Sequence, residues 1–276
     1  MKDDDQTLRP SDSYVQSFAR GLEVIRSFGA AAPRQTLTGV ADATGLTRAG
    51  ARRILLTLHT LGYVRMEGRA FELTPKILDL GFAYLTSMPV WNSAQPVMDA
   101  LVEQVHESCS IAVLDEQDVV YVMRVHTHKI MSTNLGIGSR LPAFWTSLGR
   151  VLLAELPAHE LQHLLETRDR SQFTRFTVQN DEALLAQIAQ VRVQGWCLLN
   201  QELEEGLTSV AAPIRNAAGK VVAAMNISGQ ANRTTPEVMR QTLLPQLLQA
   251  AGRVSELLGY RAGSGVACAG ACAVRG

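Results

Sequence analysis

The chain has 276 residues, of which 46% are hydrophobic and 19% charged, so it has the composition of a folded protein and room for two domains. Its 26 Lys and Arg balance its 26 Asp and Glu, which excludes a chain that is basic or acidic throughout. Four cysteines are too few for a disulfide framework, and no run approaches the roughly 20 apolar residues of a membrane span. We therefore expect a cytoplasmic protein with free thiols and no membrane contact.

The balanced total conceals a basic segment near the amino terminus. Residues 13–76 contain nine Lys or Arg and only four Asp or Glu, which leaves that segment about five units positive. A locally basic small domain is the usual electrostatic signature of DNA binding. The polar residues before it, 1–13, predict a disordered tail.

Residues 14–74 carry the elements of one small domain. Apolar residues at spacings of three and four, beginning at Phe18, predict a first helix that Ser17 caps and Gly29 ends. The next elements are expected in this order: helices over 37–44 and 47–61, then a hairpin of strands 63–66 and 71–73. Helix, short helix, longer helix and hairpin are typical of a winged helix-turn-helix.

The rest of the chain predicts a linker helix and a larger second domain. Pro75 opens the linker, which we place over 75–90, and the second domain covers 91–260. Its expected helices are 92–107, 147–156, 158–166, 181–193 and 236–258, and its expected strands are 111–114, 119–125, 207–214 and 220–228. This alternation indicates an α/β domain with a mainly antiparallel sheet, so the whole chain falls in the α+β class. Residues 261–276 predict a second disordered tail.

One face of the helix over 47–61 is a candidate DNA-binding surface. Its apolar stripe leaves arginines on the opposite side, near the helix start, where a recognition helix meets base edges in the major groove. Two more arginines flank the hairpin tip, where a wing would contact the backbone or minor groove. The predicted DNA-binding residues are Thr47, Arg48, Ala49, Arg52, Arg53, Arg65 and Arg69. The alternative is a merely solvated charged face, which the order of the elements disfavours.

A candidate anion site lies where the helix over 147–156 begins. Thr146 or Ser147 starts this helix, whose free amides and dipole favour an anion. Arg140 and Arg150 are nearby cations in the sequence, and Trp145 offers an aromatic wall. An aromatic carboxylate would suit such a site. The alternative is an ordinary helix cap with a packed Trp.

The strand over 220–228 has one face that ends in polar residues. Asn226 and Ser228 lie on that face, and Ser209 on the partner strand could join them. These residues predict a pocket lining; a sheet face that meets solvent or a helix is the alternative.

Catalytic and metal motifs are weak. His126 and His128 do not complete a metal site, and Glu202, Glu204 and Glu205 form an acidic run that we expect to be solvated. There is no nucleophile elbow, phosphate loop or dinucleotide fingerprint, so we expect no catalytic residue, no metal and no cofactor.

An ordered series of segments resembles the IclR family of bacterial regulators. It runs from Ser17 to about Tyr260 and consists of SFARGL at 17–22, RILLTL at 53–58, LTPKIL at 73–78, TSLGRVLLA at 146–154 and AAPI at 211–214. The resemblance implies a winged helix and a GAF/PAS-like effector domain. It also implies homodimers or homotetramers that form through the DNA-binding region and linker helix.

Within the family, the chain is similar to the Pca/Pob-type branch, on LPA at 141–143 and NRTTPE at 232–237. Those regulators respond to protocatechuate, 4-hydroxybenzoate or β-ketoadipate and control aromatic acid catabolism. The family's effector positions match Ser147, Gly149, Leu207, Ser209, Asn226 and Ser228. Several members carry Cys at the position of Ser209 and Ser at the position of Asn226.

The resulting hypothesis is a regulator that binds double-stranded operator DNA and a small aromatic or dicarboxylic acid. Three alternatives remain at this point: an IclR-type regulator of another small-carboxylate pathway, an enzyme acting on a small organic acid, and an architectural DNA-binding protein without an effector. An exposed arginine surface and a buried polar pocket would separate these readings.

Overall fold

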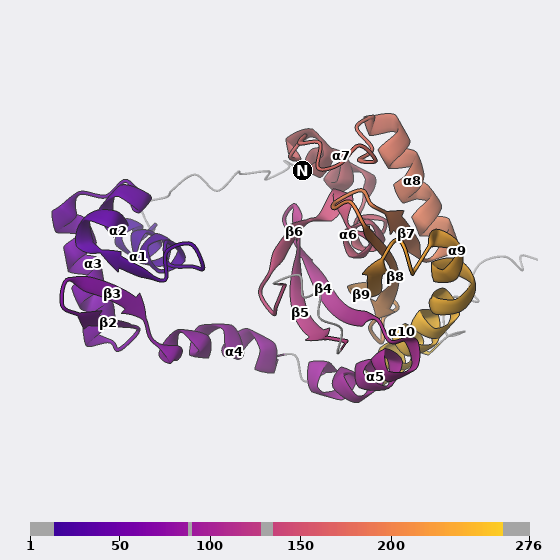
Figure 1. Ribbon diagram of the computed structural model, residues 1–276, viewed down its shortest axis with the longest axis horizontal. Helices are drawn as coiled ribbons and strands as arrows, with labels where there is room; N and C mark the ends of the chain where they lie inside the picture. Colours follow the sequence, from indigo (N-terminus) through magenta and orange to yellow (C-terminus); the bar gives the residue numbers. More distant parts are fainter. Residues whose placement is uncertain (1–13, 88–89, 128–134, 262–276) are drawn as a thin grey trace, which may run out of the picture. The chain divides into compact units, whose positions relative to one another are not determined.

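The computed structural model describes residues 14–87, 90–127 and 135–261, and it divides into two compact units at Ser87 and Met88 (Figure 1). Each unit is treated by itself. The two predicted tails fall outside the described residues, apart from Arg261. No helix among the described residues is long and apolar enough to cross a membrane.

The amino-terminal unit contains the predicted helices and hairpin. In chain order its elements are α1 (Gln16–Arg26), β1 (Arg34–Thr36), α2 (Leu37–Thr44), α3 (Arg48–Thr60), β2 (Val64–Glu67) and β3 (Ala70–Leu73). The three strands form an antiparallel sheet in the order β1-β3-β2. The side chains of Thr36 and Thr47 accept hydrogen bonds from Gly39 and Gly50, so each caps its helix as Thr does when backbone amides are left free.

The core of this unit is small and local. Val24 and Phe28 pack with buried residues of α2, α3 and the hairpin, among them Leu55 and Phe71. The prediction for the first helix is wrong at its start, since α1 begins at Gln16 after Val15 rather than at a Ser17 cap. Phe18 is 67% exposed, so the apolar stripe of α1 is only partly buried. The three-residue strand β1 was missed because it is too short to show alternation.

The segment expected to be a linker helix is helical over most of its length. A 3-10 turn over Pro75–Ile77 leads into α4 (Leu78–Ser87), and Met88 and Pro89 lie outside the described residues. No residue of α4 is buried, and Leu78 and Phe82 are among its exposed apolar side chains.

The carboxy-terminal unit is built on a six-stranded antiparallel sheet. Its strands are β4 (Ser108–Asp115), β5 (Asp118–Val125), β6 (Arg140–Pro142), β7 (Cys197–Asn200), β8 (Leu207–Arg215) and β9 (Val221–Gln230). The order across the sheet is β6-β5-β4-β9-β8-β7. The antiparallel prediction is therefore confirmed, and the short edge strands β6 and β7 are the ones that the sequence did not predict.

Helices cover both faces of this sheet. They are α5 (Val90–Val105), α6 (Ser147–Leu153), α7 (Ala158–Thr167), α8 (Asp181–Gln194), α9 (Pro236–Val238) and α10 (Leu244–Leu257). On one face α10 packs on β8 and β9 and lies beside α5; on the other, α6 packs on β4, β8 and β9 (Figure 1). The expected helix over 236–258 is interrupted by a π-helical turn at Met239–Leu243. Pro245 has no N–H to donate to the carbonyl of Gln241, which explains why the regular ladder breaks there.

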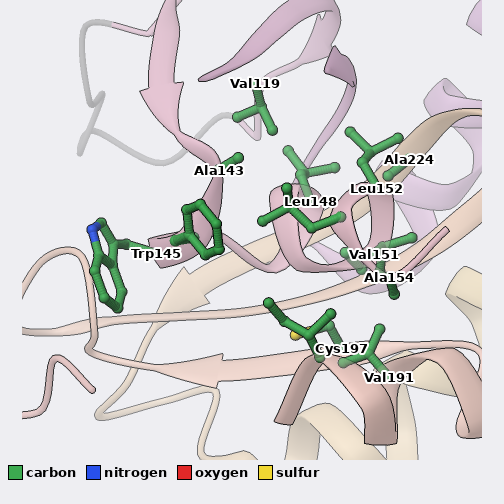
Figure 2. Close-up of a cluster of buried hydrophobic side chains, with 14 of the residues drawn as sticks. Val119, Ala143, Trp145, Leu148, Val151, Leu152, Ala154, Val191, Cys197 and Ala224 are labelled. Carbon is green, nitrogen blue, oxygen red and sulfur yellow. The ribbon is translucent and has the colours of Figure 1, made fainter. Parts of the chain in front are cut away.

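A buried apolar cluster fills the space around α6. Leu148, Val151 and Leu152 of α6 meet Ala224 of β9 and the side chains around them, and every residue of α6 is buried (Figure 2). Trp145 stands at one end of this cluster, away from Val151 and Leu152 (Figure 2). The cluster thus holds the start of α6 firmly against the sheet.

Candidate functional site

The outer side of α3 presents a row of exposed side chains. Its buried residues are Ala51, Leu55 and Leu58, which leave the opposite side free of core contacts. The residues on that free side are all exposed: Thr47, Arg48, Ala49, Arg52 and Arg53. The start of a helix with guanidinium groups clear of its own core has the geometry needed to enter a DNA major groove.

The two arginines of the hairpin differ in their surroundings. Arg65 is exposed, but its guanidinium forms an ion pair with Glu72, to which Arg34 also donates at 2.8 Å. Arg69 is exposed at the turn between β2 and β3, beside Gly68, and forms no ion pair within the described part of the unit. The tip of the wing therefore offers Arg69 more directly to a phosphate than Arg65.

The carboxy-terminal unit has a cavity of about 260 Å³ between the sheet and the start of α6. Its lining among the described residues consists of Tyr121, Arg124, Leu135, Leu141, Trp145, Thr146, Ser147, Leu199, Gln201, Glu202, Leu203, Glu204, Leu207, Ser209, Asn226 and Ser228. An apolar cavity of about 150 Å³ is large enough to hold benzene, so this one has room for a one-ring acid. Apolar walls with a few polar groups are the usual character of a small-molecule site.

The sheet supplies the floor of this cavity from strands far apart in the sequence. Ser228 pairs with Ser209 in the register of β9 with β8, and Asn226 pairs with Ser110 in the register of β9 with β4. Ser110 in turn pairs with Arg124 of β5. Paired residues in a sheet project to the same face, so the predicted polar face of β9 does line a cavity.

The residues at the start of α6 line the cavity on the side opposite the sheet. Thr146 accepts a hydrogen bond from Gly149 N at 3.0 Å and so caps its own helix. Ser209 Oγ donates to Ser147 Oγ at 2.9 Å, which ties α6 to β8 through two residues of the lining. Trp145 is buried, with its ring tilted against Phe173.

Two parts of the sequence match known domain families. Residues 17–68 match the IclR helix-turn-helix domain, and residues 82–256 match the family described as bacterial transcriptional regulator IclR C-terminal. The chain belongs to the IclR family. It is a DNA-binding transcription regulator with a carboxy-terminal effector-binding domain, as the resemblance in the sequence implied.

Curated relatives cover almost the whole of this IclR-family regulator. The Pca regulon regulatory protein of Pseudomonas putida is 42% identical over 89% of this chain and 84% of its own length. The p-hydroxybenzoate hydroxylase transcriptional activator of Acinetobacter baylyi is 33% identical over 90% of this chain and 93% of its own.

Solved structures show the same fold. A transcriptional regulator from Rhodococcus sp. RHA1 is 50% identical, with a TM-score of 0.81 over 89% of this chain and 98% of that one. An IclR homolog from Microbacterium hydrocarbonoxydans, solved with 4-hydroxybenzoate, shares the fold at 22% identity, with a TM-score of 0.77 over 88% and 98% of the two chains.

Most of the predicted effector residues of the IclR-family regulator come together in the cavity. Those that line it are Trp145, Thr146, Ser147, Leu207, Ser209, Asn226 and Ser228. Gly149 does not line it: a Cβ there would lie 2.0 Å from the carbonyl oxygen of Ala143, so this position serves close packing of α6 on the turn before it.

The two cations expected near the start of α6 do not line the cavity. Arg140 is an exposed residue of β6 whose guanidinium pairs with Asp115 at 2.5 Å and Asp118 at 3.0 Å. Arg150 is 1% exposed and lies behind the cavity wall, where it donates to the carbonyl of Phe144 and pairs with Glu202. Neither guanidinium is offered to a ligand in the cavity, because each is already paired with carboxylates.

Glu202 corrects a second expectation. The sequence suggested a solvated acidic run, but Glu202 is buried and only Glu204 and Glu205 have the expected exposure. Burial raises the pKa of the Glu202 carboxyl, and Arg150 partly offsets that rise.

Arg124 is the cation that sequence reasoning missed. A strand that alternates strictly would place Tyr121 on one face and Arg124 on the other. The register between β4 and β5 shifts at Ile111 and Ala112, so that Tyr121 pairs with Ala112 while Arg124 pairs with Ser110. This bulge brings both side chains to the cavity face, with the guanidinium carbon 5.9 Å from the centre of the Tyr121 ring.

The described residues hold no cluster of three or more His, Cys, Asp or Glu that could bind a metal ion. His126 is exposed at the end of β5, and His128 lies outside the described residues.

Proposed function

We propose that this regulator binds operator DNA through α3 and the wing, and that a small aromatic acid in the cavity of the carboxy-terminal unit changes its affinity for that DNA. The genes it controls would be those of aromatic acid catabolism. The observation that carries the proposal is the cavity of about 260 Å³, whose polar floor and aromatic wall suit a one-ring acid.

The DNA contacts are assigned to the exposed end of α3. Arg48, Arg52 and Arg53 lie on the side opposite the core residues, and the exposed Thr47 caps the helix at the same end. Arg can donate two parallel hydrogen bonds to guanine or pair with phosphate, and Thr reaches phosphate. Ala49 gives the helix a small side chain where it would approach the base edges closely. Arg65 and Arg69 would follow the backbone from the wing.

The identity of the effector class rests on the relatives as well as on the cavity. Regulators named for the pca genes and for p-hydroxybenzoate hydroxylase are 42% and 33% identical to this chain over most of its length. Protocatechuate, 4-hydroxybenzoate and β-ketoadipate are therefore the first candidates. A regulator of another small-carboxylate pathway is the second candidate, and the same cavity would serve it.

Binding rather than catalysis is the role we assign to the cavity. The side-chain hydroxyls of Ser147 and Ser209 are the groups in the cavity that could act as nucleophiles, and they form a hydrogen bond with each other. A serine nucleophile needs an adjacent base. No histidine is present among the described lining residues, and Glu202 is paired with Arg150. We therefore infer that the protein acts on transcription without turning over its ligand.

In a homodimer or homotetramer, ligand binding would change how two copies of α3 are placed for the operator and so change the affinity for DNA. An operator with two half-sites requires two copies of α3 at a set spacing. Exposed apolar residues on α1 and α4, such as Phe18 and Phe82, provide surface that a second copy could cover. The ligand needs to favour one arrangement of the two copies by about 1–3 kcal/mol. Because operator DNA is the proposed partner, we infer that the protein acts in the cytoplasm.

The test has two parts, both on the full chain. Protocatechuate, 4-hydroxybenzoate and β-ketoadipate are each titrated into the protein by calorimetry. An acid that binds should stabilise the folded protein by about 2.7 kcal/mol when its concentration is 100 times the dissociation constant, which a thermal-shift measurement detects. Binding to DNA upstream of the genes it regulates is then measured at one salt concentration, with and without the acid. A protein that binds none of the acids, or whose DNA affinity no acid alters, contradicts the proposal.

A further inference from the structure

The carboxy-terminal unit has a second hollow, which is lined by α8, β7 and the π-helical turn that contains Arg240. Its volume is about 250 Å³, well above the roughly 150 Å³ that holds benzene. Leu199 and Glu202 line both this hollow and the cavity described above, so the two spaces share a wall. We call the second one the Arg240 pocket.

The Arg240 pocket carries a net positive charge. Arg150 and Glu202 in its wall form an ion pair, with Nη2 2.5 Å from Oε2, so their charges cancel. Glu202 is the only carboxylate among the described lining residues. Arg240 is exposed, and its side chain has no ion pair or hydrogen bond within the described part of the chain. Its guanidinium is therefore available to an anion.

The side-chain amide of Gln187 offers a second donor to the same pocket. Its Oε1 accepts a hydrogen bond from Arg150 Nη1 at 2.6 Å. A guanidinium can only donate, so the amide oxygen must face Arg150 and the amide nitrogen must point away from it. This Nε2 group has no partner among the described residues, although Gln187 is half-buried and lines the pocket.

The backbone of β7 adds one more donor and one acceptor. β7 is an edge strand of the sheet, and just beyond its end Gln201 N donates to Leu207 O at 2.7 Å. Alternate residues of an antiparallel pair face the partner strand, so Leu199 points its N–H and C=O toward β8. Leu198 therefore points its N–H and C=O outward, at the pocket that it lines.

We propose that the Arg240 pocket is a second ligand site of this regulator, separate from the first cavity, and that it takes a small oxyanion with an O–H group beside its charge. Arg240, the amide nitrogen of Gln187 and the N–H of Leu198 donate to the anion, and the C=O of Leu198 accepts from the hydroxyl. A hydroxy acid and a hydrogen phosphate both have this chemistry. The shared wall brings the bound anion next to the Arg150–Glu202 pair.

Ligands of other charge do not match these groups. A cation would meet the guanidinium of Arg240 without a carboxylate to offset it, since Arg150 already pairs with Glu202. A neutral ligand would leave the charge of Arg240 uncompensated. An anion without a hydroxyl would satisfy the donors but leave the C=O of Leu198 without a partner.

The experiment measures binding to the full chain by calorimetry at constant ionic strength and near neutral pH. The probes are L-malate, succinate, which lacks the hydroxyl, succinamide, which lacks both hydroxyl and charge, and inorganic phosphate. Arg240→Gln removes the unpaired cation. Gln187→Glu keeps an oxygen for Arg150 but replaces the donor by a negative charge. Arg233→Gln is the matched control, because Arg233 is also exposed and lies outside the pocket lining.

The expected result is an anion affinity that depends on the pocket residues. Malate, phosphate or both should bind the wild type with a dissociation constant below about 1 mM. Succinate should bind several-fold more weakly than malate, and succinamide most weakly. Arg240→Gln and Gln187→Glu should each weaken binding about tenfold or more, while Arg233→Gln behaves as wild type. The tighter of malate and phosphate identifies the class of ligand.

A titration with 4-hydroxybenzoate separates the two sites. If the anion binds in its own pocket, its apparent dissociation constant should reach a plateau as 4-hydroxybenzoate is raised. A dissociation constant that rises in proportion to 4-hydroxybenzoate would place the anion in the first cavity and overturn the inference.

The remaining outcomes are also decisive. If neither malate nor phosphate binds at up to about 10 mM, the inference is wrong. It is equally wrong if Arg240→Gln keeps the wild-type affinity; that variant loses no hydrogen bond, so its melting temperature should be that of the wild type. Equal affinity for malate and succinate would remove the hydroxyl from the proposed ligand class. If no aromatic acid binds, the proposed function fails, and the two variants still test this pocket.

Discussion

Arg150 and Glu202 form a buried ion pair behind the wall of the cavity. Arg150 Nη2 lies 2.5 Å from Glu202 Oε2, although the two residues are 52 positions apart in the chain. Arg150 Nη1 also donates to Gln187 of α8 at 2.6 Å, and its Nε donates to the carbonyl of Phe144 at 2.9 Å. The pair thus joins α6 and α8 to the segment before β8 that lines the cavity.

Replacing one partner of this ion pair should lower the free energy of unfolding more than replacing both partners by apolar residues. We expect Arg150→Met to lower the free energy of unfolding by about 3–5 kcal/mol, because it leaves Glu202 buried without its counter-charge. The double variant Arg150→Met/Glu202→Leu should recover part of that loss. Denaturant unfolding of the wild type, both single variants and the double variant gives the coupling energy.

The pH dependence supplies a second check on the same variant. Without Arg150, burial is the largest remaining influence on the pKa of Glu202 and raises it above the unfolded value of about 4.3, against a smaller lowering by the backbone hydrogen bond of Val178. Above that value the unfolded chain loses the proton while the native state holds it, so stability should fall as pH rises. Arg150→Met should therefore be closer to wild-type stability at pH 5 than at pH 7; an equal loss at both would contradict the pairing.

The exposed face of α3 predicts a defined loss in DNA binding. Arg52→Ala should weaken operator binding by about 1–3 kcal/mol and reduce the slope of log affinity against log salt by about one, without lowering thermal stability. Arg253→Ala, which removes an exposed arginine from α10, is the control for net charge. Undiminished affinity of Arg52→Ala at fixed salt would remove this residue from the DNA surface.

Two helical glycines should respond oppositely to the same change. At Gly149 a Cβ would meet the backbone of Ala143 at 2.0 Å, so Gly149→Ala should destabilise by about 1–3 kcal/mol or more and weaken effector binding. At Gly252 in α10 a Cβ meets nothing within 4 Å, so Gly252→Ala should stabilise by about 0.5–1 kcal/mol. Thermal or denaturant unfolding of the pair measures both, and equal effects would contradict the close approach of α6 to Ala143.

Buried thiols predict a loss of stability in alkali. Burial raises the pKa of the Cys197 thiol to about 12, compared with about 8.5 for a free thiol. Between those values the unfolded chain releases a proton that the native chain keeps, so stability should fall as pH rises, by up to about 1.4 kcal/mol per unit. Denaturant unfolding from pH 8 to pH 10 should show a shallower decline for Cys197→Ala than for the wild type. Parallel curves would show that this thiol titrates alike in both states.

Local features of the fold could be predicted well from the sequence. The helix expected over 37–44 is α2, which Gly45 ends in the left-handed region at φ 64°. The alternation of β9 put Asn226 and Ser228 on the polar face that lines the cavity. The start of α1 was misplaced, because its apolar stripe continues past the core to the exposed Phe18.

The sequence by itself determined the order of the main elements and the exposed arginine face of α3, since these depend on residues within a few positions of one another and on the periods of helix and strand. Only the tertiary structure decided which charged groups meet the cavity. A bulge between β4 and β5 places Arg124 on the cavity face of the sheet, whereas Arg140 and Arg150 form ion pairs outside the cavity with residues distant in the sequence. Register shifts and pairings across 22 to 52 positions depend on how strands and helices pack, and no local pattern records them.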